Sequence, residues 1–159
     1  MRKLNFAALG LLLGVLPFSS VLAMPSQISS PGEKVVIVNP RIHQWGAYTA
    51  DGRLIRSGTA ATGKYYCADT GRGCKTKAGS FRVFHMGGKG CFSSRFPIPR
   101  GGAPMPYCMY YNGNQALHGS YEVRPAHPSH GCVRLHVGDA HWLRYNFVNN
   151  GTLVRVLPY

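Results

Sequence analysis

The sequence predicts a mainly β domain with one helix near its C-terminal end. Residues 34–38 read Lys-Val-Val-Ile-Val, and β-branched residues in such a short run are typical of a strand. Asp51-Gly52 is a two-residue hairpin signal. Only residues 139–148 combine apolar side chains at helical spacing with a start and a stop signal. These three observations define the fold class, and the other elements fit around them.

The first half of the chain is expected to consist of strands joined by turns. After residues 34–38, residues 42–49 form the second expected strand, and residues 53–56 return from the hairpin as the third. Residues 60–63 are small and end in glycine, which marks the end of that strand. Residues 80–85 alternate polar and apolar side chains, as expected of a half-buried strand.

Two loops separate these strands from the next pair. Residues 64–79 form a basic loop, and residues 87–106 form a long loop rich in Gly, Pro and Arg. A loop of that length is usually functional or disordered. Residues 107–111 and 115–118 are then expected to be short strands around an Asn-Gly turn.

The helix is expected to begin at Asp139, a suitable N-cap residue. Asn150-Gly151 supplies the stop signal, and residues 152–157 form the final strand. The apolar face of this helix would consist of Ala140, Leu143, Phe147 and Val148.

The first 23 residues read as a signal peptide. A short basic head precedes a largely apolar run over residues 6–21, and Ala23 is a small residue of the kind that signal peptidase recognises. The run is short for a membrane span and Pro17 interrupts it, although a retained anchor is the alternative. We expect cleavage after Ala23 and export to the periplasm or cell envelope, or secretion.

The exported chain would comprise a flexible lead-in over residues 24–33 and one domain over residues 34–159. The full chain has a formal net charge of +13, or 13 − 2 = +11 once Arg2 and Lys3 are removed. A protein this basic is expected to associate with polyanions. Acidic envelope polymers and nucleic acid are both candidates, and charge alone does not choose between them.

Five cysteines in an exported protein allow two disulfides and leave one thiol over. We expect Cys67 to pair with Cys74 and Cys91 with Cys108, since each pair would close a loop, although four cysteines allow three connectivities. Cys132 is the cysteine whose neighbours indicate another function.

The neighbours of Cys132 suit a nucleophile. Ser129, His130 and Gly131 precede it, and a glycine there lets backbone N–H groups approach a developing oxyanion. On spacing alone, His118 and His130 are about equally good candidates for the base. A nearby imidazole can lower a thiol pKa to between ~3.5 and ~7.5. No acid lies beside the motif, so we expect a backbone carbonyl to orient the base.

Arg134 lies two residues after Cys132. If this segment is extended, both side chains lie on one face of the strand. A planar guanidinium there would suit a substrate carboxylate, and a solvated surface charge is the alternative.

Residues 129–134 read Ser-His-Gly-Cys-Val-Arg and, together with the preceding His-Gly-Ser of residues 118–120, resemble the signature of the L,D-transpeptidase catalytic domain family of bacterial cell-wall enzymes. Residues 75–81 are similar to the family's Thr-Pro-x-Gly-x-Phe element, and the similarity extends over residues 34–159. It implies a β-sandwich-like catalytic domain that needs no metal or cofactor. Carbapenems acylate the cysteine of this family, so the resemblance also implies that they would react with this chain.

The resemblance implies that Cys132 attacks the carbonyl joining the third residue, commonly meso-diaminopimelate, to the D-alanine of a peptidoglycan tetrapeptide. D-alanine leaves, and the thioester passes to an amine of a second stem. His118 would be the base, the Gly119 carbonyl would orient it, and backbone N–H groups near Gly131 and Cys132 would hold the oxyanion. The substrate-binding residues would be Tyr107, Ser129, His130, Gly131 and Arg134.

Two positions depart from the family pattern. Lys77 stands where proline is usual, and Val137 stands where an asparagine often follows the signature. Neither is expected to touch the thiol. The loop cysteines are not general to the family and suggest a stapled lid that affects substrate choice.

The sequence is also compatible with other functions. A nucleic-acid binder would need aromatic residues interleaved with the basic ones, whereas here they fall mostly on strands, so no nucleic acid is expected. An L,D-carboxypeptidase would use the same nucleophile and base with water as acceptor, and a host-facing effector that acts on wall fragments would also keep both residues. A zinc protein is disfavoured because the spacings of its possible ligands match no closed zinc pattern. Those ligands are His118, His127, His130, Cys132, His136 and His141.

Overall fold

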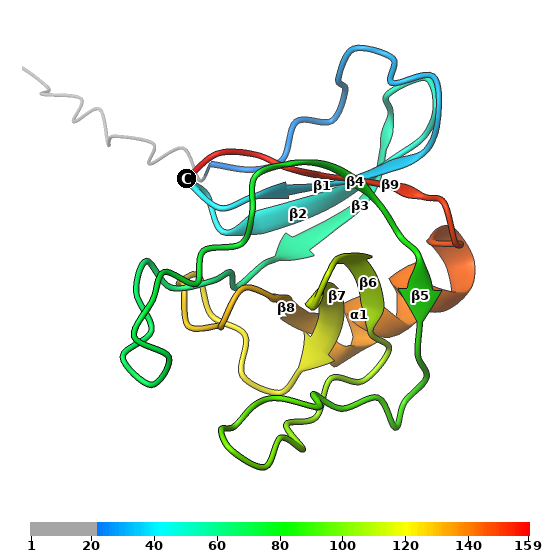
Figure 1. The fold of residues 1–159 in the computed structure, drawn as a ribbon. Coiled ribbons are helices and arrows are strands. Elements are labelled where there is room, and N and C mark those ends of the chain that lie inside the picture. Colours follow the sequence, from blue (N-terminus) through cyan, green and yellow to red (C-terminus); the bar gives the residue numbers. More distant parts are fainter. Residues whose placement is uncertain (1–21) are drawn as a thin grey trace, which may run out of the picture.

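The computed structural model describes residues 22–159, so nearly all of the signal peptide predicted over residues 1–23 lies outside the described residues. The described part consists mainly of strands in two sheets, with one short helical segment near its C-terminal end (Figure 1). This confirms the predicted fold class. No helix within residues 22–159 is long and apolar enough to cross a membrane.

The first sheet has five strands in the order β3-β2-β1-β9-β4. The central strand β1 is antiparallel to β2 and parallel to β9. Val36 and Val38 of β1 face the main core, whereas Val35 and Ile37 are buried in a second cluster with Met24. Burial on both faces explains why β1 is continuously apolar. The bounds are β1 Val35–Asn39, β2 Gln44–Tyr48, β3 Leu54–Thr59, β4 Gly79–Arg82 and β9 Leu153–Val156.

The second sheet has four strands in the order β5-β6-β7-β8. Its strands are β5 His85–Met86, β6 Met109–Asn112, β7 Gln115–Ser120 and β8 Val133–His136. β7 and β8 are parallel neighbours. Parallel neighbours require a crossover connection of about a dozen residues or more. Residues 121–132 form this connection and carry the Ser-His-Gly-Cys stretch.

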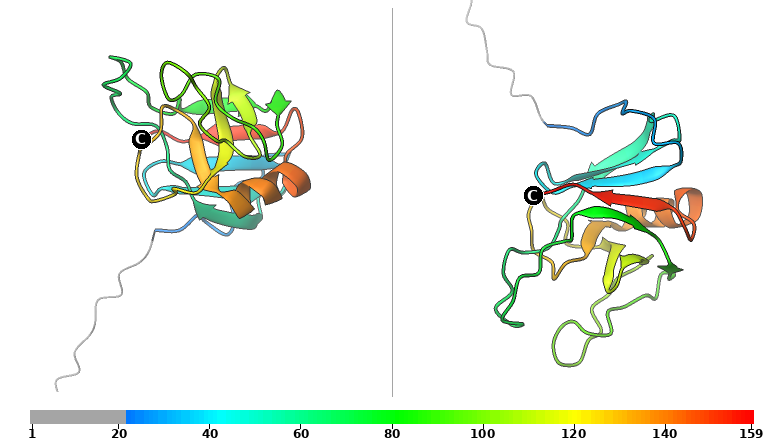
Figure 2. Two further views of the ribbon diagram at one scale, coloured as in Figure 1. Left: turned by 90° about the horizontal axis from the view of Figure 1, so that it is seen from below. Right: turned by 45° about the horizontal axis from the view of Figure 1, so that its top comes forward.

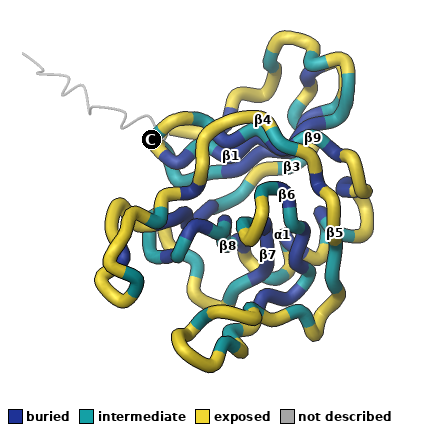
Figure 3. Tube along the Cα trace, viewed as in Figure 1, coloured by how far each residue is buried: buried dark blue, intermediate teal, exposed yellow. Residues whose placement is uncertain are grey.

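The main hydrophobic core lies between the two sheets, which form the two layers visible in Figure 2. The helix α1, Val137–Trp142, packs against β7 and β8 and continues into a π-helical turn η1, Leu143–Phe147. Figure 3 shows buried positions along the strands and α1, and mostly exposed positions in the long loops. The residues that join the sheets in this core include Val36, Trp45, Val154, Met109, Leu117, Val133 and Leu135.

Two expectations about secondary structure are wrong. The single strand expected over residues 80–85 is divided, because β4 pairs with β9 in the first sheet while β5 pairs with β6 in the second. The helix N-cap is His136 and not Asp139, which lies in the first turn. The Asp139 carboxylate binds Arg56 instead, at 2.8 and 3.1 Å.

The lead-in that was expected to be flexible lies against the first sheet. The Leu54 N–H donates to the Ser26 carbonyl, and the Ile28 N–H donates to the Gly52 carbonyl, both at 2.9 Å. Met24 is buried against this face of the sheet. The apolar side chains of the lead-in cover the outer face of β1, which would otherwise expose valine and isoleucine to water.

The Arg56–Asp139 pair connects the two layers and gives a stability prediction. Only 14% of the Asp139 side chain is exposed, so removing its partner leaves a largely buried carboxylate unpaired. We expect Arg56→Ala to lower the free energy of unfolding by about 1–3 kcal/mol, measured by urea denaturation. Arg82→Ala, which removes an exposed pair with Glu33, is the control and should change it much less. Equal effects would contradict this interpretation.

Candidate active site

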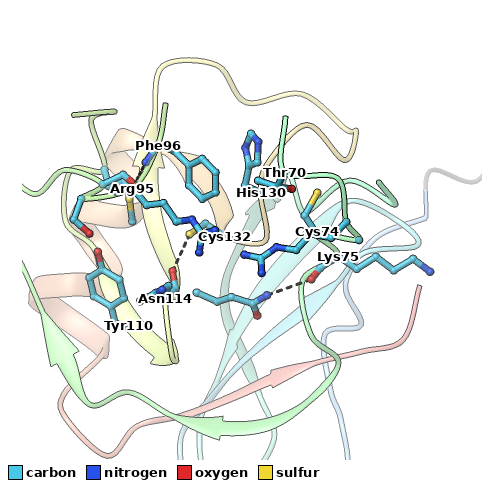
Figure 4. Close-up of a pocket in the computed structure, with 15 residues that line it drawn as sticks. Thr70, Cys74, Lys75, Arg95, Phe96, Tyr110, Asn114, His130 and Cys132 are labelled. Atoms are coloured by element: carbon cyan, nitrogen blue, oxygen red, sulfur yellow. Dashed lines mark hydrogen bonds between the residues drawn. The ribbon is translucent and has the colours of Figure 1, made fainter. Parts of the chain in front are cut away.

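Two neighbouring cavities, of about 320 and 280 Å³, meet at Cys132. Figure 4 shows the larger cavity, with Cys132 between the side chains contributed by the loops and Asn114 beneath it. Both cavities are therefore routes by which a ligand could approach one sulfur atom. The residues that line both are Ser93, Phe96, Met105, His130 and Cys132.

The register of β7 and β8 places the chemical groups on one face of the second sheet. Leu117 pairs with Val133, and His118 pairs with Arg134. Leu117 and Val133 face the core, so the alternate positions His118, Arg134 and Cys132 point to the opposite face. Cys132 and Arg134 thus share a face, as expected from their spacing, and His118 is their neighbour on the adjacent strand.

Cys132 is the free thiol of the described chain. Cys67 is bonded to Cys74 and Cys91 to Cys108, which confirms the predicted pairing. Each disulfide closes a loop beside the cavities, and Cys74 itself lines the larger one.

The surroundings of Cys132 keep its thiol protonated. Its Sγ donates a hydrogen bond to the Asn114 carbonyl at 3.5 Å. Burial raises the pKa of the Cys132 thiol above its ordinary value, and the Ala116 N–H and the Arg134 charge lower it by less. The expectation of a thiol pKa lowered by an imidazole is therefore wrong for this state. The raised pKa favours the neutral thiol form of Cys132.

His118 is 5% exposed and has the geometry of a base. Its Nδ1 lies 2.8 Å from the Gly119 carbonyl, which can only accept, so Nδ1 carries the proton. Nε2 of the neutral ring is then free to accept one. Burial lowers the pKa of His118 to about 4, with a further lowering from the Arg134 charge, although the bond to Gly119 raises it. His118 is thus neutral at physiological pH.

His130 has different surroundings from His118. Its Nε2 lies 2.7 Å from Asp69 Oδ2, and its ring stacks on Phe96 with a centroid separation of 4.1 Å. The two histidines could not be distinguished by spacing. The structure places the Gly119 carbonyl against Nδ1 of His118, and it places His130 in the wall of both cavities.

The turn before Cys132 is held by side-chain hydrogen bonds. Gly131 has φ of 119°, which L residues with a side chain rarely adopt, and a Cβ there would lie 2.8 Å from Gln115 Nε2. The Gly131 N–H donates to Ser129 Oγ at 3.1 Å, and Ser129 Oγ donates to the Cys132 carbonyl at 2.5 Å. Ser129 therefore shapes the turn and lies mostly buried beneath the site.

Thr76 is a buried residue of the site that sequence reasoning did not single out. Its hydroxyl donates to the Gly131 carbonyl at 2.9 Å and accepts from the Gly63 N–H at 3.0 Å. The neighbouring departure, Lys77, uses its backbone N–H to donate to Gln115 Oε1 at 3.1 Å. Proline has no such donor, so this bond is one that the usual family residue could not make.

Tyr107 lies away from the two cavities. Its ring packs on His141 and Tyr145, with centroid separations of 5.0 and 5.9 Å. It is not among the residues that line either cavity, so the structure gives no support to a role as a pocket wall. The wall of the larger cavity includes Tyr110 and Met105 instead.

The two cavities differ in charge. The larger one is lined by Arg72, Lys75 and Arg95, and its lining contains no carboxylate among residues 22–159. Figure 4 shows the Lys75 side chain extending away from Cys132, and its Nζ lies 4.1 Å from the centre of the Tyr65 ring. The smaller cavity has Arg134 and also Glu122. The larger cavity thus suits an anionic group, and the smaller one offers partners for both charges.

One cluster within residues 22–159 brings potential metal ligands together. Atoms of Cys67, Asp69 and His130 lie within 4.8 Å of one another. Because Cys67 is bonded to Cys74, its sulfur is not the thiolate that metal binding requires. Of the six residues considered for a zinc site, this cluster contains His130 alone.

The chain was also compared with known proteins. The family model described as YkuD, L,D-transpeptidase catalytic domain, matches residues 33–156. Similar solved structures include an L,D-transpeptidase from Xylanimonas cellulosilytica, at 27% identity and a TM-score of 0.70, which covers 82% of this chain and 63% of that one. An L,D-transpeptidase from Mycobacterium smegmatis is 20% identical with a TM-score of 0.65, covering 79% and 59%. No curated protein sequence matched.

The ionisation of the site gives a direct prediction. Iodoacetamide reacts with thiolate, so its reaction with Cys132 should still be rising with pH at the ordinary thiol pKa of about 8.5. The raised pKa of Cys132 should also make this reaction slower at pH 7 than in urea-unfolded protein with its disulfides intact, which is the control. Rates are read by intact mass. A rate that levels off below pH 7 would indicate a thiolate–imidazolium pair and contradict the neutral resting state.

Proposed function

The chain belongs to the L,D-transpeptidase catalytic domain family, and on that basis we propose that it is a peptidoglycan L,D-transpeptidase with Cys132 as its nucleophile. The chain spans about three fifths of the length of the relatives whose structures it resembles, 63% of the Xylanimonas protein. The observation that carries the proposal is a free thiol on the same sheet face as a buried histidine whose Nδ1 is bound to a backbone carbonyl.

Acylation begins from the neutral pair. As Cys132 Sγ attacks the carbonyl carbon between the third residue and D-alanine of a tetrapeptide stem, the thiol proton passes to Nε2 of His118. The carbon–nitrogen bond then breaks, and the imidazolium returns that proton to the departing D-alanine amine. The product is a thioester on Cys132 with His118 neutral again. Proton transfer at the moment of attack suits a thiol that is not ionised beforehand.

Transfer to the second stem reverses these steps. An amine of the acceptor attacks the thioester carbonyl and loses a proton to Nε2 of His118. The carbon–sulfur bond breaks, and the sulfur regains its proton from the imidazolium. The low pKa of His118 makes its protonated form short-lived, which favours return of the proton in both half-reactions.

The oxyanion of each tetrahedral intermediate is assigned to the Cys132 N–H. The Gly131 N–H already donates to Ser129 Oγ, so it would have to exchange that partner before it could bind a substrate. The bonds of Ser129 and Thr76 that hold the turn keep the Cys132 backbone in position. A preorganised donor of this kind is effective because it needs no rearrangement during the reaction.

The charges around the thiol fit stem peptides. Arg72 and Arg95 in the larger cavity, and Arg134 beside His118, are suited to the free carboxylates of such peptides. Glu122 in the smaller cavity is suited to an amine. Acidic envelope polymers remain proposed partners on the basis of the net charge of +13. A similar solved structure, LdtMt1, is described in complex with imipenem, and carbapenems are accordingly proposed ligands here.

Export to the periplasm or cell envelope is part of the proposal. The support is the position of Met24, the first residue after the proposed cleavage site. Leu22 and Ala23 are exposed, whereas Met24 is buried and its N–H donates to Gln44 Oε1 at 3.0 Å. Cleavage after Ala23 would therefore retain the buried Met24 and remove the exposed Leu22 and Ala23.

The function is tested by incubation with disaccharide-tetrapeptide. We expect a cross-linked dimer that has lost one D-alanine, identified by mass spectrometry. Cys132→Ser, which keeps the size of the side chain, should reduce the rate by at least about 10³-fold, a loss typical of removing a catalytic nucleophile. Tripeptide without dimer would show an L,D-carboxypeptidase, and full turnover by Cys132→Ser would contradict the role of the thiol.

A further inference from the structure

We propose that Asp69 is a positioning residue that holds His130 against Phe96, and that these three side chains form a clamp controlling which groups reach Cys132. The inference rests on the proposed role of Cys132 and deepens it by assigning the selectivity of access to the two stapled loops. Asp69 is not among the residues that line the two cavities and contacts His130 instead, so it acts through the His130 ring.

The clamp joins three separate segments of the chain. Asp69 lies in the loop closed by the Cys67–Cys74 disulfide, and Phe96 lies in the loop closed by the Cys91–Cys108 disulfide. His130 belongs to the crossover between β7 and β8. His130 Nε2 lies 2.7 Å from Asp69 Oδ2, and the His130 ring stacks on Phe96 at 4.1 Å. These two contacts connect both loops to the turn before Cys132.

The clamp lies where the two cavities meet. Phe96 and His130 line both cavities, as Cys132 does. In the view of Figure 4 the Phe96 and His130 side chains lie together above Cys132, on the side opposite Asn114. A group that approaches the sulfur from either cavity therefore meets a wall that includes these two rings.

The contacts suit control of access more than global stability. About 47% of the Asp69 side chain and 23% of the His130 side chain are exposed, and a polar contact this exposed adds little to the free energy of unfolding. A planar ring is nevertheless free to turn about its side-chain bonds unless something fixes it. Asp69 on one side and Phe96 on the other fix the plane of the imidazole.

The disulfides explain why such a clamp can hold its geometry. The larger loop is long and rich in glycine, and a loop of that kind would sample many conformations. Closing it at Cys91–Cys108 restricts those conformations, and the Cys67–Cys74 bond does the same for the loop that carries Asp69. The ligand class that this opening favours is a slim, extended chain such as the end of a stem peptide.

The test compares how fast a small and a bulky reagent alkylate Cys132, using iodoacetamide and fluorescein maleimide on the whole oxidised protein. The four other cysteines are in disulfides, so intact mass reports Cys132 alone. Asp69→Ala and Phe96→Ala should each raise the bulky-to-small rate ratio about fivefold, the factor that corresponds to losing about 1 kcal/mol of contact energy. Asp69→Asn, whose amide oxygen can still accept a hydrogen bond from His130, should restore most of the original ratio.

Glu33→Ala is the matched control, since it removes an exposed carboxylate contact, with Arg82, that is not part of either cavity. It should leave the ratio unchanged. Equal ratios in Asp69→Ala, Phe96→Ala and the parent protein would overturn the proposal, as would an equal rise in Glu33→Ala. If Asp69→Ala does not fold, judged by circular dichroism, Phe96→Ala decides the question. Alkylation does not depend on transpeptidation, so the two proposals can fail separately.

Discussion

The parallel pairing of β7 with β8 is the constraint on which the rest of the structure depends. It forces the chain between them to cross from one end of the sheet to the other, and that crossover carries Ser129, His130 and Gly131. It also sets His118 beside Arg134 with Cys132 on the same face. A shift of one residue in this register would turn the imidazole toward the core and expose Leu117 in its place.

Burial decides the ionisation of the site. The thiol and the imidazole are both held in their neutral forms, because the surrounding protein solvates charge less well than water does. A shift of the His118 pKa from 6.5 to about 4 corresponds to about 3 kcal/mol. Its sign follows from linkage: the unfolded chain takes up the proton first, so this contribution to stability is lost as pH falls from 6.5 toward 4. The burial that keeps Nε2 of His118 unprotonated therefore also makes the stability of the protein sensitive to acid.

Local patterns predicted the fold well where one physical cause dominates. The β-branched run of β1 and the hairpin at Asp51-Gly52 follow from local sequence and are present. The two loop disulfides are also as expected, although the sequence left three connectivities open. The division of residues 80–85 between two sheets could not be predicted, since alternation reveals which side chains are buried but not against which sheet. The helix start was misplaced because the partner of Asp139 is Arg56, which is distant in sequence.

The same limit applies to the candidate site. Cys132 stands out in the sequence because glycine, serine and histidine precede it, whereas His118 was preferred to His130 only through the family resemblance. Asp69 and Phe96 do not stand out, because each is an ordinary loop residue until the fold brings it to His130. Thr76 is visible only as part of a family-like segment, and its role is to hold the Gly131 carbonyl.

Acylation by a carbapenem is the measurement that tests the central claim most directly, since it requires an accessible sulfur and a base and no second substrate. The account predicts one adduct per chain, mapped by peptide mass to Cys132, and a rate that falls sharply in His118→Ala while the disulfides stay intact. An adduct on another residue, or an undiminished rate in His118→Ala, would contradict it.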